Sequence, residues 1–597
     1  MKNLTPFAKF LIIAAIGTVL FFGYREAMQY GLIPTPGIMK ALVPERVSLP
    51  DIKDSKVQNV APVTLPQSVE AEVEDILIRG AIWEWNSQLG LFYAIGGAKT
   101  TKGSLMEKHK VNLMLYRQDD TNKMQEDLIA CAKELHDGAK QCTNGANFVI
   151  IMGDGSGQFL AAVNPQLKKL GDQYKAIIIG SQGYSRGEDC FMAPPEVKKN
   201  PQKAKGLLIS GVLRDGDWNI AQKWAADNNI KNNPDDKTYD PDALNWINSS
   251  DYNVAAADYV AGKCEDRKVV KDGHLTGETK HICIGATVTW TPGDVTVVQQ
   301  KGGLVKIVST KEYRSQMPGV ILGPKAFFEA NKMQIQHMLA AIFEGGDQVK
   351  AYDAALKKAA DVSSKVYNDQ DGAYWAKYYK GVVETDKDGN KVELGGSSVN
   401  NLADNLILFG LMPGMNDNFK STYTLFSKIA VQQYPAIFKD TPIPDVREVE
   451  DKSYILGAQS LMSDSGAAPE VQKFVPSTSG TVVSKRAYSI NFNTGKSTLT
   501  AAGVAQLNEL KDSIAITGLS VKIDGYTDNV GSDLVNRPLS LDRAMAVKQF
   551  LQQVASENFP DSRFTVTGHG SASPVQENTT EAGRAANRRV EITLLGQ

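Results

Sequence analysis

Apolar segments of strand length alternate with amphipathic segments of helix length in the first third of the chain. The runs VNLMLY (111–116), FVIIMG (148–153) and KAIIIG (175–180) are typical of buried strands. Amphipathic stretches at 122–135 and 158–170 separate them. The order strand, helix, strand predicts a parallel sheet covered by helices, so an α/β fold is expected for this part of the chain.

Polar, glycine-rich loops follow two of these predicted strands: GDGSG at 153–157 and SQGYSRGED at 181–189. Ligands of α/β sheets bind at the carboxyl ends of the strands, which makes these loops candidates for a solute site. A glycine loop that leads into a helix can also direct backbone N–H groups at an anion. GDGSG lacks the lysine and hydroxyl residue of a P-loop, however, and a tight turn explains it equally well.

The length of 597 residues is too great for one hydrophobic core, so two or three domains are expected. Lysine plus arginine number 65 against 67 aspartate plus glutamate, a net charge of −2, which gives no indication of nucleic acid binding. Proline-rich and serine-rich stretches mark the boundaries. The expected segments are a membrane anchor (1–30), a proline-rich tether (31–67), a two-lobed domain (68–462), a linker (463–480) and a small α+β domain (481–597).

The N-terminal run Phe10–Tyr24 carries no charge and is flanked by Lys9 and Arg25. As a helix it spans roughly 22 Å, and the two flanking side chains can extend it toward the ~30 Å of a bilayer core. A cleavable signal peptide is the competing interpretation, although no small-x-small cleavage site follows the run. We expect an uncleaved single-pass inner-membrane anchor, and either interpretation places the rest of the chain in the periplasm.

The five cysteines suit an oxidising compartment. Cys131 with Cys142 and Cys264 with Cys283 are near enough in sequence to form local bridges, which leaves Cys190 unpaired. The chain has no C-x-x-C motif, so neither a zinc site nor thioredoxin-like chemistry is indicated.

Signals for catalysis, metal binding or a cofactor are lacking in the sequence. The six histidines are scattered, and none belongs to an H-E-x-x-H motif or follows a G-x-S-x-G elbow. The stretch TDKDGNK (385–391) resembles a calcium loop, but Gly395 stands where that loop needs glutamate, so a hairpin turn is predicted. We therefore expect a protein that is not an enzyme, with no catalytic residues, no metal and no cofactor.

Residues 80–105 place two tryptophans and an amide, Trp83, Trp85 and Asn86, between an apolar strand and a helix, a combination that suits a small polar ligand. Here the chain resembles periplasmic substrate-binding proteins of ABC-type uptake systems, two-lobed domains that close on a solute. The resemblance covers roughly residues 70 to 450 and includes LYRQDDTNKM (115–124), GVLRDGDWNIAQKWA (211–225), TWTPGDVTVV (289–298) and the helical stretch 326–348.

This resemblance implies a solute-binding cleft between two lobes. Its lining would be Trp83, Trp85, Asn86, Asp154, Ser156, Arg214, Asp215 and Asp217. The alternative for the two tryptophans is that they belong to the hydrophobic core.

Near the C-terminus, the stretch GYTDNVGSDLVNRPLSLDRAMAV (525–547) joins a strand to a helix. Pro538 and Ser540 predict the start of that helix, which puts Arg543 in its first or second turn. An acidic loop residue, Asp528, and a helix arginine can hold the ammonium and the carboxylate of one zwitterion, and the helix N-terminus would favour its anionic end. The alternative is that Asp528 and Arg543 only bridge each other.

At these residues the chain closely resembles the OmpA-like peptidoglycan-binding domain, also through TGHGSASP (567–574) and GRAANRRVEI (583–592). The resemblance implies that the ligand is the diaminopimelate of the peptidoglycan stem peptide. The matching positions are Asp528 and Arg543, with Thr527, Asn536 and Leu539 beside them. The chain departs from the family at Asn493, where an aspartate is common, and Arg588 and Arg589 are interpreted mainly as framework residues.

Together these features predict a membrane-anchored, peptidoglycan-binding periplasmic protein of a Gram-negative-type envelope. Its middle domain would bind a small solute, for delivery or sensing through a membrane transporter or signalling complex. The alternative is a non-catalytic scaffold, or a stator-like protein of the MotB type, that links inner membrane and cell wall. The predicted membrane segment lacks the acidic group that an ion-coupled stator needs, which weakens the motor version of that alternative.

Overall fold

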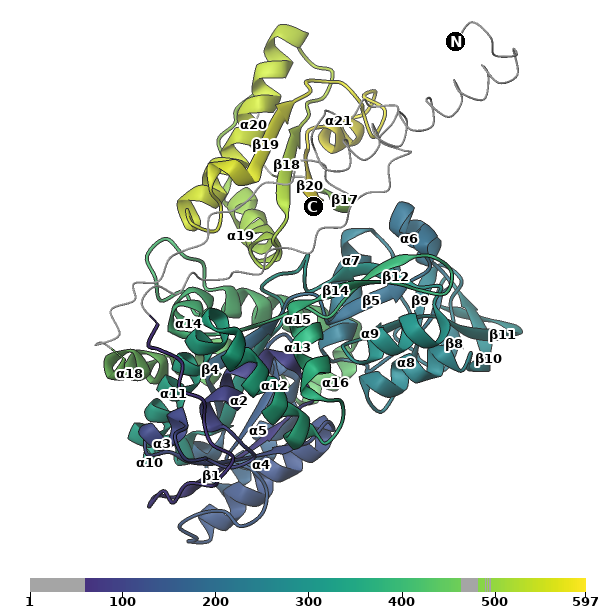
Figure 1. The fold of residues 1–597 in the computed structure, drawn as a ribbon. Helices are drawn as coiled ribbons and strands as arrows, with labels where there is room; N and C mark the ends of the chain where they lie inside the picture. Colours follow the sequence, from purple (N-terminus) through teal and green to yellow (C-terminus); the bar gives the residue numbers. More distant parts are fainter. Residues whose placement is uncertain (1–59, 463–481, 489, 491, 493–494, 597) are drawn as a thin grey trace, which may run out of the picture. The chain divides into compact units, whose positions relative to one another are not determined.

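The computed structural model describes residues 60–462 and 482–596, apart from 489, 491, 493 and 494 (Figure 1). The predicted anchor, most of the tether and the linker at 463–480 lie outside the described residues. Among the helices of the described ranges, none is long and apolar enough to cross a membrane.

The first lobe of the middle domain is built on a six-stranded sheet in the order β16-β4-β13-β3-β1-β2. Strands β1, β2 and β3 are parallel, as predicted, but β13 runs antiparallel to β3 and β4, and β16 is antiparallel to β4. The sheet is therefore mixed, because β13 enters from the second lobe and runs in the opposite direction. The strands are β1 (Leu77–Ile82), β2 (Asn112–Arg117), β3 (Phe148–Met152), β4 (Ala176–Ser185), β13 (Pro318–Pro324) and β16 (Ser397–Val399).

Helices that follow the predicted pattern cover this sheet (Figure 1). The amphipathic stretch at 122–135 forms α4 (Thr121–His136), where the Asp120 carboxylate accepts hydrogen bonds from the first free N–H groups. The stretch at 158–170 forms most of α5 (Ser156–Leu167). The main further helices of the lobe are α2 (Leu89–Ile95), α11 (Lys332–Ala351) and α12 (Asp353–Tyr367).

The loop predicted at 181–189 is only partly a loop. Strand β4 continues through residue 185, because β13 on one side and β16 on the other hydrogen-bond to this extension. The remaining residues, 186–189, carry the chain from the first sheet to the second.

The second lobe has its own sheet, with the main order β12-β5-β11-β6-β9-β7. The chain crosses between the sheets from β4 to β5 and returns from β12 to β13, which confirms the two-lobed architecture. Its strands are β5 (Cys190–Ala193), β6 (Leu208–Gly211), β7 (Lys231–Asn232), β9 (Ala243–Asn248), β10 (Cys264–Lys271, paired with β11), β11 (His274–Thr289) and β12 (Val305–Ser309). Its helices include α7 (Gly216–Asp227), α8 (Tyr252–Val260) and α9 (Gly293–Thr296).

Two smaller predictions for the middle domain are confirmed. Disulfides join Cys131 to Cys142 and Cys264 to Cys283, and Cys190 is free and buried. The stretch 385–391 turns between the antiparallel strands β14 (Val382–Thr385) and β15 (Lys391–Leu394), as expected for a hairpin.

The C-terminal domain is a four-stranded sheet in the order β17-β20-β18-β19, with three helices. Strands β18 and β19 are parallel, and β20 is antiparallel to β18. The core holds Val521 and Ile523 of the sheet against Ala544, Val547 and Leu551 of the long helix α20. The elements are β17 (Val482–Tyr488), α19 (Ala501–Ala515), β18 (Ser520–Gly525), α20 (Asp533–Val554), β19 (Phe564–Gly568), α21 (Glu581–Asn587) and β20 (Val590–Leu595).

The predicted start of helix α20 is wrong. The helix begins at Asp533, and Pro538 lies inside it. Proline there removes one hydrogen bond, to the carbonyl of Leu534, in an exposed first turn that tolerates the loss. Arg543 is consequently the eleventh helical residue, too far along for the helix N-terminus to contribute at its side chain.

Candidate functional site

The loop after strand β18 holds the predicted acidic residue in a fixed position. Asp528 is 7 % exposed, and its Oδ1 accepts a 3.0 Å hydrogen bond from the N–H of Val530. The buried Asn536 amide of α20 donates to the carbonyls of Asp528 (3.4 Å) and Val530 (3.2 Å). Asn536 therefore stabilises the loop conformation, which holds the Asp528 carboxylate in one orientation.

The ion-pair partner of Asp528 is Arg588, at the end of α21. Its Nη1 lies 2.6 Å from Oδ2 of Asp528, and its Nη2 lies 2.7 Å from Oε1 of Glu581. The interpretation of Arg588 as a framework residue is thus incomplete, because it contacts the central acid of the site. Its position follows from the pairing of Gly525 with Val590 on β18 and β20, which no local sequence pattern reveals.

Arg543 is buried, at 4 % exposure, yet no carboxylate of the described residues forms an ion pair with it. Its Nε donates to the carbonyl of Lys496 (3.2 Å), and its guanidinium carbon lies 5.3 Å from the ring centre of Phe492. Burial and the positive charge of Arg588 lower its pKa, against the opposing effect of Asp528. The alternative in which Asp528 and Arg543 simply bridge each other is not what the structure shows.

The remaining predicted residues surround this group. Thr527 is buried with its hydroxyl unpartnered, while its N–H donates to the carbonyl of Gly570 (2.8 Å). Leu539 is partly buried on α20. Arg589, in contrast, is a framework residue: its guanidinium lies 3.9 Å over the Tyr526 ring and pairs with Glu591 at 2.7 Å. The site therefore combines a fixed carboxylate, a buried guanidinium and a free hydroxyl, groups that suit a ligand with both charges.

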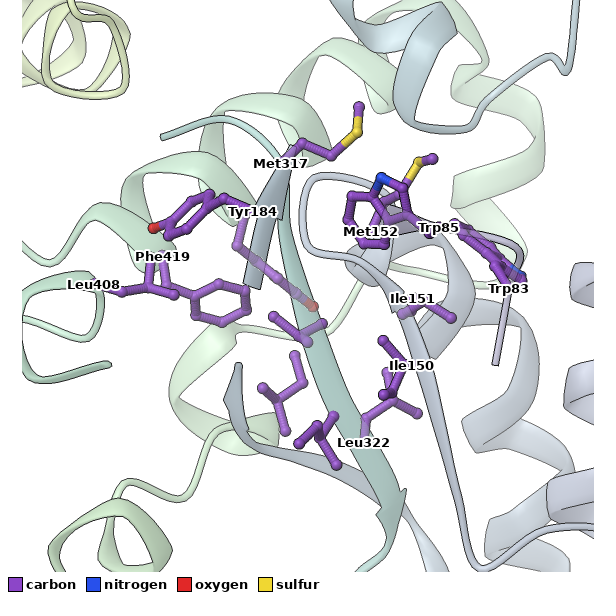
Figure 2. Packing of buried hydrophobic residues seen from close by; sticks show 14 of the residues in the cluster. Trp83, Trp85, Ile150, Ile151, Met152, Tyr184, Met317, Leu322, Leu408 and Phe419 are labelled. Atoms are coloured by element: carbon purple, nitrogen blue, oxygen red, sulfur yellow. The ribbon is translucent and has the colours of Figure 1, made fainter. Parts of the chain in front are cut away.

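In the middle domain, Trp83, Trp85 and Asn86 are all nearly inaccessible and belong to the segment between β1 and α2. Figure 2 shows the two indoles beside Met152, at the end of strand β3. Trp83 also packs against Trp290 of the second lobe, with ring centres 5.7 Å apart. The two lobes are therefore in contact at the predicted cleft.

The GDGSG turn places Asp154 inside this cleft. Its Oδ2 accepts hydrogen bonds from Gln316 (2.8 Å) and Asn219 (3.3 Å), and its Oδ1 has no partner. Burial raises the pKa of Asp154 to about 8. The Ser156 hydroxyl donates to the carbonyl of Gly153 (2.6 Å), so it stabilises the turn.

The loop between β6 and α7 separates its three predicted residues. Arg214 is exposed, has a φ of 67°, and its guanidinium lies 5.2 Å from the Tyr434 ring centre. Asp215 is half-buried and caps α7 through the N–H of Gly216 (2.9 Å). Asp217 is completely buried. The acids thus lie deeper in the cleft than the arginine.

A cavity of about 490 Å³ lies where the loops after β3 and β6 face each other. Its volume is in the range of small-molecule sites. Its lining includes Trp83, Gly155, Gln158, Phe159, Arg214 and Asp215.

Several buried residues at the cleft were not predicted from the sequence. Trp85 Nε1 donates to Oδ2 of Asp189 (3.3 Å), and the Asn86 amide donates to Oε2 of Glu188 (3.4 Å). These two acids stand in the crossing between the sheets, where only the three-dimensional arrangement reveals their role. The other unpredicted residues are Glu84, Tyr252 and Trp290.

Comparison with known proteins gives matches to two separate parts of the chain. Residues 491–588 match the OmpA family. The chain is 38 % identical over 109 residues to outer membrane porin F of Pseudomonas fluorescens, covering 18 % of this chain and 32 % of the relative. It is also 38 % identical over 106 residues to the peptidoglycan-binding protein ArfA of Mycobacterium tuberculosis, with the same coverage. The chain thus spans about a third of the length of these curated relatives.

The part before the OmpA-like domain resembles periplasmic solute-binding proteins in structure. One is the periplasmic nitrate-binding protein NrtA of Synechocystis PCC 6803, at 10 % sequence identity and a TM-score of 0.44. The match covers 66 % of this chain and 92 % of that protein.

Proposed function

We propose that this chain is a non-catalytic envelope protein that is fixed to peptidoglycan by its C-terminal domain and captures a small solute with its middle domain. The observation that carries the first half is the buried Arg543 guanidinium, which has no carboxylate partner among the described residues, near the fixed Asp528 carboxylate. A buried cation without a counter-ion is costly unless a ligand supplies one.

Diaminopimelate fits these two groups because the end of its side chain carries both an ammonium and a carboxylate. Its carboxylate would accept hydrogen bonds from Arg543, and its ammonium would donate to Asp528. The unpartnered Thr527 hydroxyl is available to the same ligand. The relative whose name describes it as peptidoglycan-binding supports this assignment.

The location follows from the N-terminal run Phe10–Tyr24 and from the envelope relatives. We propose an uncleaved anchor in the inner membrane, with both folded domains in the periplasm. In that arrangement the middle domain passes its solute, or the information that it is bound, to a membrane transporter or signalling complex.

Sedimentation with purified diaminopimelate-type peptidoglycan tests the wall-binding half. For the full-length chain in detergent, Asp528→Ala and Arg543→Ala should each weaken binding thirty-fold or more, because losing one partner of a buried charged contact costs about 2–5 kcal/mol. Asp561→Ala is the matched control. Its exposed carboxylate pairs with Lys548, which lies five residues beyond Arg543 on α20 and so roughly 8 Å farther along the helix axis. Undiminished sedimentation of both site variants would refute the assignment.

A passive scaffold between membrane and wall is the second candidate. One observation favours it: Trp83 and Trp85 are packed into the main hydrophobic core, as a structural role would require. The two candidates differ in the middle domain, since only the first requires a solute there.

A further inference from the structure

Five carboxyl groups of the middle domain cleft lack an ion-pair partner among the described residues. All except the half-buried Asp215 are 0–1 % exposed. Moving a charged carboxylate out of water without a partner costs several kcal/mol, so such a cluster needs a compensating group. The five are Asp154, Glu188, Asp189, Asp215 and Asp217.

Two cationic side chains of the region are already paired with other acids. Lys306 lies 2.9 Å from Asp294, and Arg117 lies 2.9 Å from Glu84. Burial therefore favours the protonated form of these carboxyl groups. Burial raises the pKa of Asp189 to about 6, and burial together with the nearby Asp189 raises that of Asp217 well above its ordinary value.

Unpartnered polar atoms provide an independent indication of a ligand. Asp217 is completely buried, and its carboxyl group hydrogen-bonds to the carboxylate of Asp189. The Asn219 and Asn86 amides each donate to a cleft acid and leave their own oxygens unpartnered. Buried polar atoms normally have partners, so these point to a missing molecule.

Aromatic rings stand beside the carboxyl groups. The ring centres of Trp83 and Trp290 are 5.7 Å apart, and those of Tyr252 and Trp290 are 4.8 Å apart. The Tyr252 hydroxyl accepts a 3.4 Å hydrogen bond from the N–H of Asp217, which ties the aromatic group to the acids. The indole N–H groups of Trp83 and Trp290 are buried and unpartnered.

Two other ligand classes fit less well. An anion, which the GDGSG turn allowed, would enter a cleft with five nearby carboxyl groups. A metal ion requires three ligand atoms near one another. Within the described ranges, that spacing occurs at Cys264, His281 and Cys283, whose two cysteines form a disulfide.

Resting on the proposed solute binding, we propose that the cleft binds a small organic cation, an amine or quaternary ammonium compound that also carries a hydrogen-bond-accepting oxygen. The carboxyl groups around Asp217 balance the charge, and the faces of Trp83, Trp290 and Tyr252 attract it further. The free indole N–H groups donate to the oxygen. A cavity of about 490 Å³ is lined by Trp83 and Asp215 of this group.

Tryptophan fluorescence of the full-length chain can test this proposal, because all seven tryptophans lie between residues 83 and 375. The probes are choline, ethanolamine and putrescine, with 3,3-dimethyl-1-butanol as the uncharged isostere of choline and sulfate as an anion. At least one cation should bind saturably, and the uncharged isostere should bind at least tenfold more weakly than choline if choline is that cation.

Asp217→Asn should weaken binding of that cation at least tenfold, and Trp83→Leu should weaken it severalfold. Asp388→Asn, an exposed residue of the β14–β15 turn, is the matched control. The thermal midpoint of each variant verifies folding, and Asp189→Asn replaces Asp217→Asn if that variant does not fold.

Binding of sulfate or of the uncharged probe in preference to all three amines would overturn the cation assignment while retaining solute binding. Absence of any binding would overturn it as well. Peptidoglycan sedimentation of the same preparation reports separately on the wall-binding half of the proposed function.

Discussion

At the C-terminal site the Asp528 carboxylate pairs with Arg588 and also interacts electrostatically with Arg543, whereas in the middle domain five carboxyl groups have no ion-pair partner among the described residues. The first site carries both charges and suits a zwitterion. The second has an excess of one charge and suits a ligand of the opposite charge. Under the two proposals, the charges that each site leaves unbalanced determine the class of its ligand, although both sites are well buried.

The largest effect is expected in the pH dependence of the stability of the middle domain. Burial raises the pKa values of Glu84 and Asp154 to about 8 and those of Asp189 and Asp215 to about 6. The unfolded carboxyl groups are ionised above pH 5, whereas the folded groups hold their protons up to about pH 6 for Asp189 and Asp215 and up to about pH 8 for Glu84 and Asp154. The stability of the middle domain therefore falls as the pH rises from 5 to 8. Each group contributes about 1.4 kcal/mol per pH unit until its folded pKa is passed.

Urea unfolding monitored by tryptophan fluorescence at pH 5, 6, 7 and 8 measures this slope for the middle domain alone. His337 has the opposite effect on stability, which rises with pH, because burial lowers its pKa. As a single group it does not outweigh the four acids. Acids whose pKa is lowered on folding, such as Asp386, are ionised in both the folded and the unfolded state above pH 5, so they do not change the slope of stability with pH in this range. A stability that is constant or rises toward pH 8 would contradict the account of the buried acids.

Arg588→Ala should have a smaller effect, a loss of about tenfold in peptidoglycan binding. Arg588 holds the Asp528 carboxylate at 2.6 Å, so its removal frees that side chain without removing either group assigned to the ligand. Sedimentation with peptidoglycan measures the change, and Arg537→Ala, an exposed arginine paired with Asp533, is the control. Tighter binding would mean that Arg588 competes with the ligand ammonium for Asp528.

The smallest effect is expected for the stability of Asp217→Asn. Burial and the nearby Asp189 favour the protonated form of Asp217, which hydrogen-bonds to Asp189. An amide of the same shape can donate the same hydrogen bond, so Asp217→Asn should change the free energy of unfolding by less than about 1 kcal/mol. Asp528→Asn, by contrast, removes one of the two carboxylate partners of Arg588 and leaves Glu581 as the other. Urea unfolding of both variants at pH 7 compares them, and a large loss for Asp217→Asn would indicate a structural role for that acid.

The sequence predicted what local periodicity determines. The strands and helices between 111 and 180 follow from apolar spacing, and both disulfides join cysteines close in the chain. The start of α20 was wrong because proline near a helix start can lie inside the helix as well as at its first residue.

The composition of the two sites was predicted only in part. Asp528 and Arg543 belong to one strand-loop-helix unit, so their proximity is a local property. Arg588 reaches Asp528 through sheet order, and Asp189 reaches Trp85 through the crossing between lobes. Such contacts depend on how distant segments pair, which no single stretch of sequence specifies.

The central claim, that the C-terminal site selects a zwitterion, is tested most directly by changing the ligand. Lysine-type peptidoglycan has the same ammonium as diaminopimelate-type peptidoglycan but lacks the adjacent carboxylate. We predict that the full-length chain sediments with the diaminopimelate type at least tenfold more tightly, and that Arg543→Ala binds both types equally weakly. Equal binding of the unaltered chain to both types would contradict the claim.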